Sequence, residues 1–286
     1  MSVLPKKSKR DKQAPNFVVF LVEGESDQIA LETPLSELIF EKYPDYEVRF
    51  LLQQRLVNND GEEVEDNEDE DDYIEEDEYT YGGDITTSSF VTPENIVIKI
   101  ENRFIKPATK AEGLYPKRIA KIIQIVDMDG AFLPESSVIP LAAERASLEK
   151  PFYDGENGVI ETRNIEAIRE RNTRKRKNIE HLLSLSSTGI KIGTRTIPYE
   201  IYFFSSNLDH VINNDANLES GKKFYADRFL RTYGLFPERF SRFFSESHVA
   251  IGYMGYHESW DEIMQGANSV KQMTNIDYLI NRLQED

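Results

Sequence analysis

The sequence predicts an α/β fold built on a largely parallel sheet. The continuous apolar run 17–22 and the segment 122–126, which is apolar except for Gln124, are short and typical of strands buried on both sides of a parallel sheet. A third strand is predicted over 199–204. Segments with helical spacing of apolar residues separate and follow these runs, and that alternation is typical of α/β proteins.

The N-terminal part contains the first strand and the first helix. Residues 1–15 form a basic tail that ends in Pro15 and is expected to be disordered. Over 28–42 the apolar residues recur with helical spacing, which predicts a helix. Residues 47–52 favour the next strand, and the alternation at 96–100 favours another, either resuming the sheet or belonging to an added hairpin.

An acidic segment, 58–90, interrupts this pattern. Residues 60–78 hold 14 acids and no base, so removing them changes the formal net charge from −17 to −3. Blocks of like charge repel one another and rarely fold alone. We therefore expect an exposed insertion. A bolder hypothesis is that it mimics nucleic acid and shields an active site or docks on a basic partner.

The C-terminal part reads as helical. A charged helix is predicted at 161–183, and the region 211–286 reads as an α-helical elaboration of an α/β domain spanning 16–210. The helices of this elaboration are predicted at roughly 219–233, 237–246, 258–269 and 274–284. Its many aromatic residues favour a helical core, with a dimer or partner surface as the alternative.

Composition excludes several classes of protein. The chain of 286 residues has no cysteine, so disulfides, thiolate zinc sites and cysteine nucleophiles are excluded. No apolar run approaches the roughly 20 residues of a membrane span, and the basic N-terminus lacks the apolar stretch of a signal peptide. These features favour a cytoplasmic protein with no membrane partner.

Acidic residues follow the predicted strands. Glu23 and Asp27 come after the first strand, Asp127 and Asp129 after the second, and Asp209 after the third. Ligands of open parallel sheets bind beyond the carboxyl ends of the strands, where these carboxylates would converge. Such a cluster needs cations, and oxygen ligands suit Mg²⁺ or Mn²⁺. Asp209 could instead cap the helix or turn that follows it.

A strand ending in Glu23-Gly24, an acid four residues after the glutamate at Asp27, and a later strand ending in Asp127-x-Asp129 resemble the Toprim domain of topoisomerases, primases and OLD-family nucleases. The resemblance covers roughly 16–210. It implies a Toprim-like fold, a role for Glu23 in acid–base chemistry or metal binding, and metal-ligand roles for Asp127 and Asp129. Asp27 stands where the OLD-like branch has a second acid.

The resemblance also implies a function, namely Mg²⁺- or Mn²⁺-dependent cleavage of RNA, possibly tRNA, or of DNA. A short solitary chain of this kind is similar to the small Toprim effector that accompanies an ABC-type ATPase in PARIS and abortive-infection defence against phage. That similarity implies control by a partner ATPase, which must be a separate chain because this one has no Walker A motif. The non-enzymatic alternative is a silent Toprim module that binds and regulates such an ATPase.

A rival interpretation is a haloacid-dehalogenase-like phosphatase. There Asp127 would be the nucleophile and Asp129 the acid, with 203–207 as a second motif and Lys222 or Lys223 as a third. Against it, no later apolar strand ends in an acidic pair, and Glu23 is left without a role.

Basic residues are densest on the predicted helix at 161–183. The candidates for nucleic-acid contact are Arg171, Arg174, Lys175, Arg176 and Lys177. The alternative is a solvated face that pairs with neighbouring glutamates, but five bases within 171–177 exceed what those acids can pair. His210 is interpreted as structural, with general acid as the other possibility. A homodimer is also possible.

Overall fold

The computed structural model describes residues 4, 16–57, 63 and 78–284, and its centre is a four-stranded sheet. The strand order is β2-β1-β5-β11, and all three pairings are parallel. The strands are β1 (Asn16–Val22), β2 (Tyr46–Leu52), β5 (Ile119–Asp127) and β11 (Tyr199–Phe204). The predicted α/β class with a mostly parallel sheet is confirmed, as are the strands expected at 17–22, 47–52, 122–126 and 199–204.

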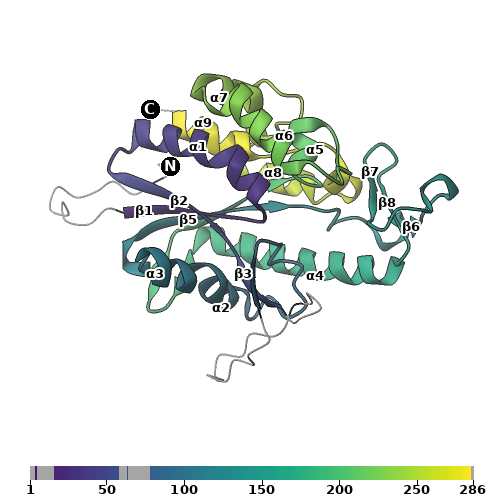
Figure 1. Ribbon diagram of the computed structural model, residues 1–286, viewed down its shortest axis with the longest axis horizontal. Coiled ribbons are helices and arrows are strands. Elements are labelled where there is room, and N and C mark those ends of the chain that lie inside the picture. Colours follow the sequence, from purple (N-terminus) through teal and green to yellow (C-terminus); the bar gives the residue numbers. More distant parts are fainter. Residues whose placement is uncertain (1–3, 5–15, 58–62, 64–77, 285–286) are drawn as a thin grey trace.

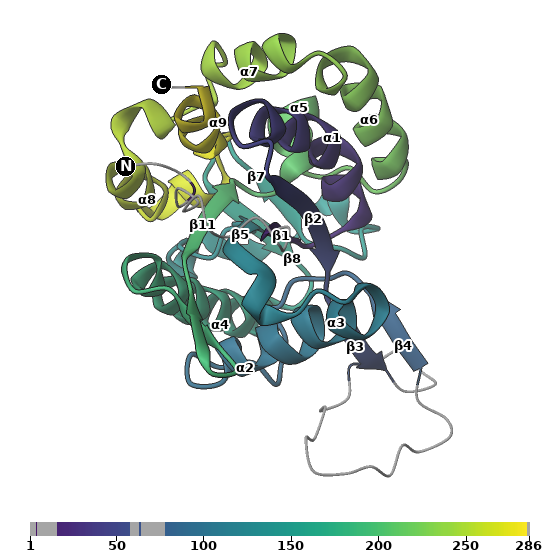
Figure 2. The same ribbon diagram turned by 90° about the vertical axis from the view of Figure 1, so that its left-hand side faces the viewer.

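Helices cover both faces of this sheet, giving three layers (Figure 1). One face carries α1 (Glu25–Lys42) and most of the C-terminal helices. The other carries α2 (Ile96–Ile100), α3 (Lys106–Glu112) and α4 (Ile165–Ser184), as the view along the sheet edge shows (Figure 2). No described helix combines the length and apolarity needed to cross a membrane.

The apolar character of β1 follows from its position between these layers. Val19 and Leu21 belong to the core beneath α2 and α4, whereas Val18 and Phe20 belong to the core beneath α1. Successive side chains of a strand point to opposite faces, so a strand covered on both sides needs apolar residues at every position.

The C-terminal region is helical, as predicted. It contains α5 (Leu208–Asn213), α6 (Lys222–Phe229), a π-helical turn (Leu230–Gly234), α7 (Pro237–Ser245), α8 (Tyr256–Ile263) and α9 (Ile276–Gln284). Three aromatic residues of this region, Phe229, Phe240 and Phe244, are buried against one another. The expectation of an aromatic helical core is confirmed for them, while Phe224 and Phe236 are exposed.

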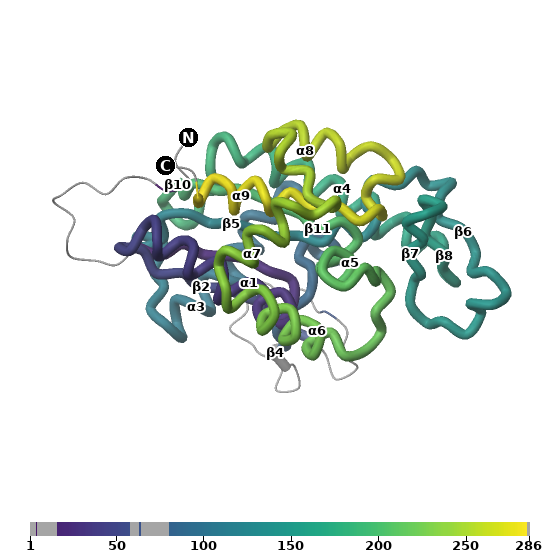
Figure 3. The backbone as a smooth tube through the Cα atoms, turned by 90° about the horizontal axis from the view of Figure 1, so that it is seen from above, coloured from purple at the N-terminus to yellow at the C-terminus, as the bar shows by residue number. Residues whose placement is uncertain are grey.

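Within the part of the chain that the structure describes, three small sheets are added to the central one. Two are antiparallel pairs, one of β3 (Gln54–Val57) with β4 (Glu78–Tyr81), the other of β9 (Ile190–Ile192) with β10 (Arg195–Ile197). The third consists of β6 (Val138–Pro140), β7 (Phe152–Asp154) and β8 (Val159–Thr162). Seen from above, this sheet lies at one end of the molecule (Figure 3).

Two predictions are wrong. Residues 96–100 form helix α2 rather than a strand: Ile96 and Ile100 are buried and Ile98 is half exposed, so the alternation also fits one helical turn. The described end of the expected exposed insertion packs into the protein, because Ile85, Thr86 and Ser88 are buried. The rest of the insertion, 58–62 and 64–77, and all of the tail 1–15 except Leu4 lie outside the described residues.

Candidate metal centre

The acids after β1 and β5 meet at the carboxyl edge of the sheet, as predicted. Because β1 and β5 are parallel neighbours, Glu23 and Asp127 leave the sheet side by side, and Oε1 of Glu23 accepts a 2.9 Å hydrogen bond from the backbone N–H of Asp127. Asp129 follows in the left-handed region with φ 48°, an uncommon conformation for a residue other than glycine. Such strained positions are concentrated at functional sites.

Asp84 completes a triad that sequence reasoning missed. One ligand oxygen each from Glu23, Asp84 and Asp129 lies within 4.8 Å of the other two, so the three could hold a divalent metal. Asp84 is placed by the backbone N–H of Gly83, which donates to the carbonyl of Glu23 at 2.6 Å, and by a turn in which its Oδ1 accepts from the N–H of Thr86. The sequence does place an acid directly after Gly82-Gly83. It is difficult to single out because it lies close to the acidic tract.

The ammonium of Lys175 lies among these three carboxylates. Its Nζ is 2.7 Å from Asp129, 2.8 Å from Asp84 and 3.9 Å from Glu23, and the side chain is fully buried. Burial lowers the pKa of Lys175, but the carboxylates outweigh it and raise the pKa well above its ordinary value, so the lysine is cationic. The triad and Lys175 together carry a charge of −2 when the acids are ionised.

This surplus of negative charge affects the pKa values of the acids. Burial, reinforced by Asp84, raises the pKa of Glu23 well above its ordinary value. For Asp129 burial acts in the same direction, but Lys175 and Arg171 overcome it and lower the pKa. Uncompensated buried charge is costly. The site therefore favours either protonation of Glu23 or a bound cation.

A second acidic group lies beside the triad. Burial together with Asp27 raises the pKa of Asp127 well above its ordinary value, and burial raises the pKa of Asp27 to about 6. Asp27 also accepts the backbone N–H of Gly24 at 2.9 Å in the first turn of α1. Among the described residues, neither joins the compact triad.

Asp209 does not meet the triad either. Its carboxylate pairs with Lys222 at 3.2 Å and accepts from Asn213 at 3.3 Å. It is not the helix cap proposed as the alternative, because Asn207 is the N-cap of α5 and accepts the N–H of His210. His210 is mostly buried, and burial lowers its pKa, which favours the neutral form.

A pocket of about 410 Å³ opens over the acids. Glu23, Asp127 and Asp129 contribute to its lining. One wall is formed by residues 148 and 150–153, which lie before and within β7. The other wall is formed by Asn207, residues 216–219 and Lys222, around the loop between α5 and α6. Reacting groups placed in this pocket would face the carboxylates, Lys150 and Lys222.

The basic residues of α4 point mostly into the protein. The prediction of nucleic-acid contact is wrong for Lys175, which is buried in the triad. Arg171 donates to the carbonyl of Asp129 at 2.8 Å, and Arg176 donates to those of Ala131 and Leu133. These arginines bind carbonyls of the loop after β5, which lies against α4 and needs donors.

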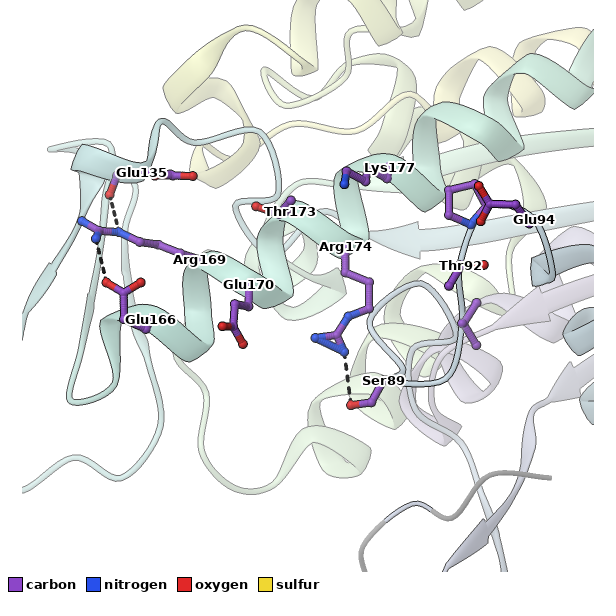
Figure 4. A pocket seen from close by; sticks show the side chains of 12 residues that line it. Ser89, Thr92, Glu94, Glu135, Glu166, Arg169, Glu170, Thr173, Arg174 and Lys177 are labelled. Carbon is purple, nitrogen blue, oxygen red and sulfur yellow. Dashed lines mark hydrogen bonds and ion pairs between the residues drawn. The ribbon is translucent and has the colours of Figure 1, made fainter. Parts of the chain in front are cut away.

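The outward face of α4 carries charges of both signs. It borders a second pocket, of about 560 Å³, where Arg174 reaches Ser89 and Arg169 pairs with Glu166, while Lys177 is exposed (Figure 4). Glu94, Glu135 and Glu170 line the same pocket. Contact of Arg174 and Lys177 with nucleic acid stays a prediction.

Three of the residues assigned to the second and third motifs of the phosphatase interpretation are engaged elsewhere. The hydroxyls of Ser205 and Ser206 are buried and donate to the carbonyls of Asn268 and Val270. Lys223 forms an ion pair with Glu25. Of the two lysines, Lys222 faces the acids, and its charge opposes the rise that burial and Asp27 cause in the pKa of Asp127.

Comparison with protein-family models, with curated proteins and with solved structures finds no match in any of the three. The fold and the site define the class on their own: an α/β protein with an acidic centre, at the carboxyl edge of a parallel sheet, that could hold a divalent metal.

Proposed function

We propose that this chain is a divalent-metal-dependent phosphodiesterase that cleaves nucleic acid, with Mg²⁺ or Mn²⁺ as its ion. The observation that carries the proposal is the triad of Glu23, Asp84 and Asp129, of which Glu23 and Asp129 line a pocket. All three offer oxygen ligands, which hard divalent cations prefer. Their charge of −2, after Lys175 is counted, is the charge that one divalent ion neutralises.

The side chains around the triad suit this chemistry. An ion held by the triad would supply Lewis-acid stabilisation of charge on the phosphate and its leaving oxygen. Burial raises the pKa of Glu23 well above its ordinary value, and its carboxylate lines the pocket, where it could exchange a proton with a reacting group. Lys150 and Lys222 line the pocket and can contact phosphate oxygens.

The biological setting is part of the proposal. An anti-phage effector in the cytoplasm, restrained by a separate ABC-type ATPase, is the setting that the Toprim resemblance implies. It rests on Glu23-Gly24 and Asp127-x-Asp129, which end or directly follow adjacent parallel strands, and on Asp27 in the first turn of α1.

A silent binding module is the second candidate, and one observation favours it. Lys175 already occupies the space among the triad oxygens, at 2.7 and 2.8 Å from two of them. If its ammonium serves as a permanent counter-ion, the acids have a structural role and no ion binds.

The test is hydrolysis of bis-p-nitrophenyl phosphate, tRNA and plasmid DNA with Mg²⁺ or Mn²⁺. Glu23→Gln, Asp127→Asn and Asp129→Asn are compared with Asp261→Asn, an exposed acid of α8. We expect cleavage by the wild type and by the control, and its loss in the three site variants. Activity that survives Glu23→Gln but not Asp127→Asn supports the phosphatase interpretation. No hydrolysis and no Mn²⁺ binding by any form supports the silent module.

A further inference from the structure

The two walls of the pocket that Glu23, Asp127 and Asp129 line are joined by a pair of hydrogen bonds, here called the clamp. The backbone N–H of Tyr153 donates to Oδ1 of Asn217 at 2.7 Å, and Nδ2 of Asn217 donates back to the carbonyl of Tyr153 at 2.9 Å. The side chain of Asn217 thus pairs with β7 as a neighbouring strand would. Asn207 fixes the same loop by donating to the carbonyl of Ala216 at 2.9 Å.

This clamp limits what can reach the acids. The pocket volume of about 410 Å³ lies near the lower end of the roughly 300–1,000 Å³ of sites that enclose one small molecule. Such a space accommodates about one nucleotide. A base that is paired and stacked in a duplex must leave the helix to enter a pocket of this kind.

An aromatic ring in one wall is held in place by a chain of contacts that ends at a buried glutamate. Phe152 lines the pocket, and the guanidinium of Arg145 stacks on its ring, 4.2 Å from the centroid. Glu161, which is almost fully buried, holds Arg145 at 2.8 Å and also accepts the N–H of Ala142 at 2.8 Å. A ring fixed in this way is a prepared surface for stacking, since its orientation does not have to be selected on binding.

We propose that the pocket takes one unpaired nucleotide of a single-stranded nucleic acid, with its base stacked on Phe152 and its phosphates near Lys150 and Lys222. This inference rests on the proposed function and adds the substrate class: single strands and unpaired loops rather than duplex. Aromatic stacking combined with cations that follow the backbone is the usual means of binding single strands.

The experiment measures binding without cleavage. A short labelled single strand and the blunt duplex of the same sequence are titrated with the full chain in the absence of divalent ions. We expect the single strand to bind at least about tenfold more tightly than the duplex. Phe152→Ala should weaken binding of the single strand at least fivefold, an effect of about the size that loss of one stacked base produces.

Two further variants separate stacking from folding. Phe152→Leu keeps an apolar side chain against Arg145 but has no ring, so it should lose single-strand affinity while unfolding at the same urea concentration as the wild type. Tyr253→Ala removes a more exposed aromatic ring that does not line the pocket and should change nothing. Equal affinity for the two nucleic acids, binding of neither, or unchanged binding by both Phe152 variants overturns the inference.

Hydrolysis of bis-p-nitrophenyl phosphate distinguishes failure of the single-strand inference from failure of the proposed phosphodiesterase function. That small diester needs the acids and the ion but no strand. If it is hydrolysed while single strand and duplex bind alike, the phosphodiesterase assignment stands and the single-strand assignment falls.

Discussion

Nζ of Lys175 lies 2.7 Å from Oδ2 of Asp129, and the lysine side chain is fully buried. The two residues come from different elements, α4 and the turn after β5, so their ion pair fixes the helix across the carboxyl edge of the sheet. The same ammonium also contacts Asp84. Lys175 therefore acts both as a link between elements and as the counter-ion of the triad.

Replacing Lys175 with methionine should destabilise the protein at neutral pH by about 3–5 kcal/mol, because loss of one partner leaves buried carboxylates without compensation. The loss should shrink when Mn²⁺ is added, since an ion that binds only the folded state stabilises it. Urea unfolding with and without Mn²⁺ measures both effects. Lys177→Met is the matched control, two positions along α4 and exposed. If the two variants unfold alike, Lys175 does not compensate the triad.

Asp84→Asn should reduce Mn²⁺ affinity by about tenfold or more, because it removes one charged ligand from the triad; even loss of a group that only supports a ligand costs about 10–100-fold. The amide oxygen of asparagine can still accept from Thr86, so the turn should remain. Isothermal titration with Mn²⁺ makes the comparison, and Asp261→Asn serves as the control. Unchanged Mn²⁺ affinity would remove Asp84 from the site.

The predicted strands and the acids directly after them were accessible from the sequence. Runs such as 17–22 have a single consistent explanation, burial on both faces of a sheet, and parallel strands bring the acids that follow them to one edge. Glu23, Asp127 and Asp129 therefore fall where the pattern places them.

Asp84 and Lys175 were not accessible in this way, because their positions depend on tertiary packing. Asp84 lies next to a long acidic run, where one functional acid resembles the others, and only the pairing of β3 with β4 carries it to Glu23. Lys175 belongs to a basic run that resembles a phosphate-binding surface. The role of Lys175 depends on which side of α4 faces the sheet. The pattern of charged residues along the helix does not reveal that side.

Gly130→Ala should destabilise the protein by more than about 1 kcal/mol and impair metal binding. Gly130 adopts φ +72°, and a Cβ atom there would lie 2.6 Å from Cδ1 of Ile160 and 3.0 Å from Cγ1 of Val270, so either these buried side chains or the turn that carries Asp129 would have to shift. Gly266→Ala is the control, with φ +51° but no atom within 4 Å of an added Cβ, and it should show only the backbone cost, of about 1 kcal/mol. Thermal unfolding and Mn²⁺ titration compare the two. Equal effects would mean that packing around Gly130 does not position the turn.

Asp277 should make stability depend on pH in a direction opposite to that of a salt-bridged acid. Burial raises its pKa to about 6, above the roughly 3.9 of an unfolded aspartate, although it accepts the N–H of Gly252 at 2.9 Å. Between these values the folded protein binds a proton that the unfolded chain does not. The resulting stabilisation is therefore full below about pH 4 and is lost as the pH rises through about 6.

Asp277→Asn should remove this part of the pH dependence. A shift of about two pKa units corresponds to at most about 3 kcal/mol. The variant should therefore match the wild type near pH 4 and exceed its unfolding free energy at pH 7 by up to that amount. Urea unfolding across pH 4–8 measures the difference, and Asp261→Asn, which replaces an exposed acid of α8, should follow the wild-type curve. If the Asp277→Asn variant reproduces the wild-type curve at every pH, the buried carboxyl of Asp277 is not protonated in the folded protein.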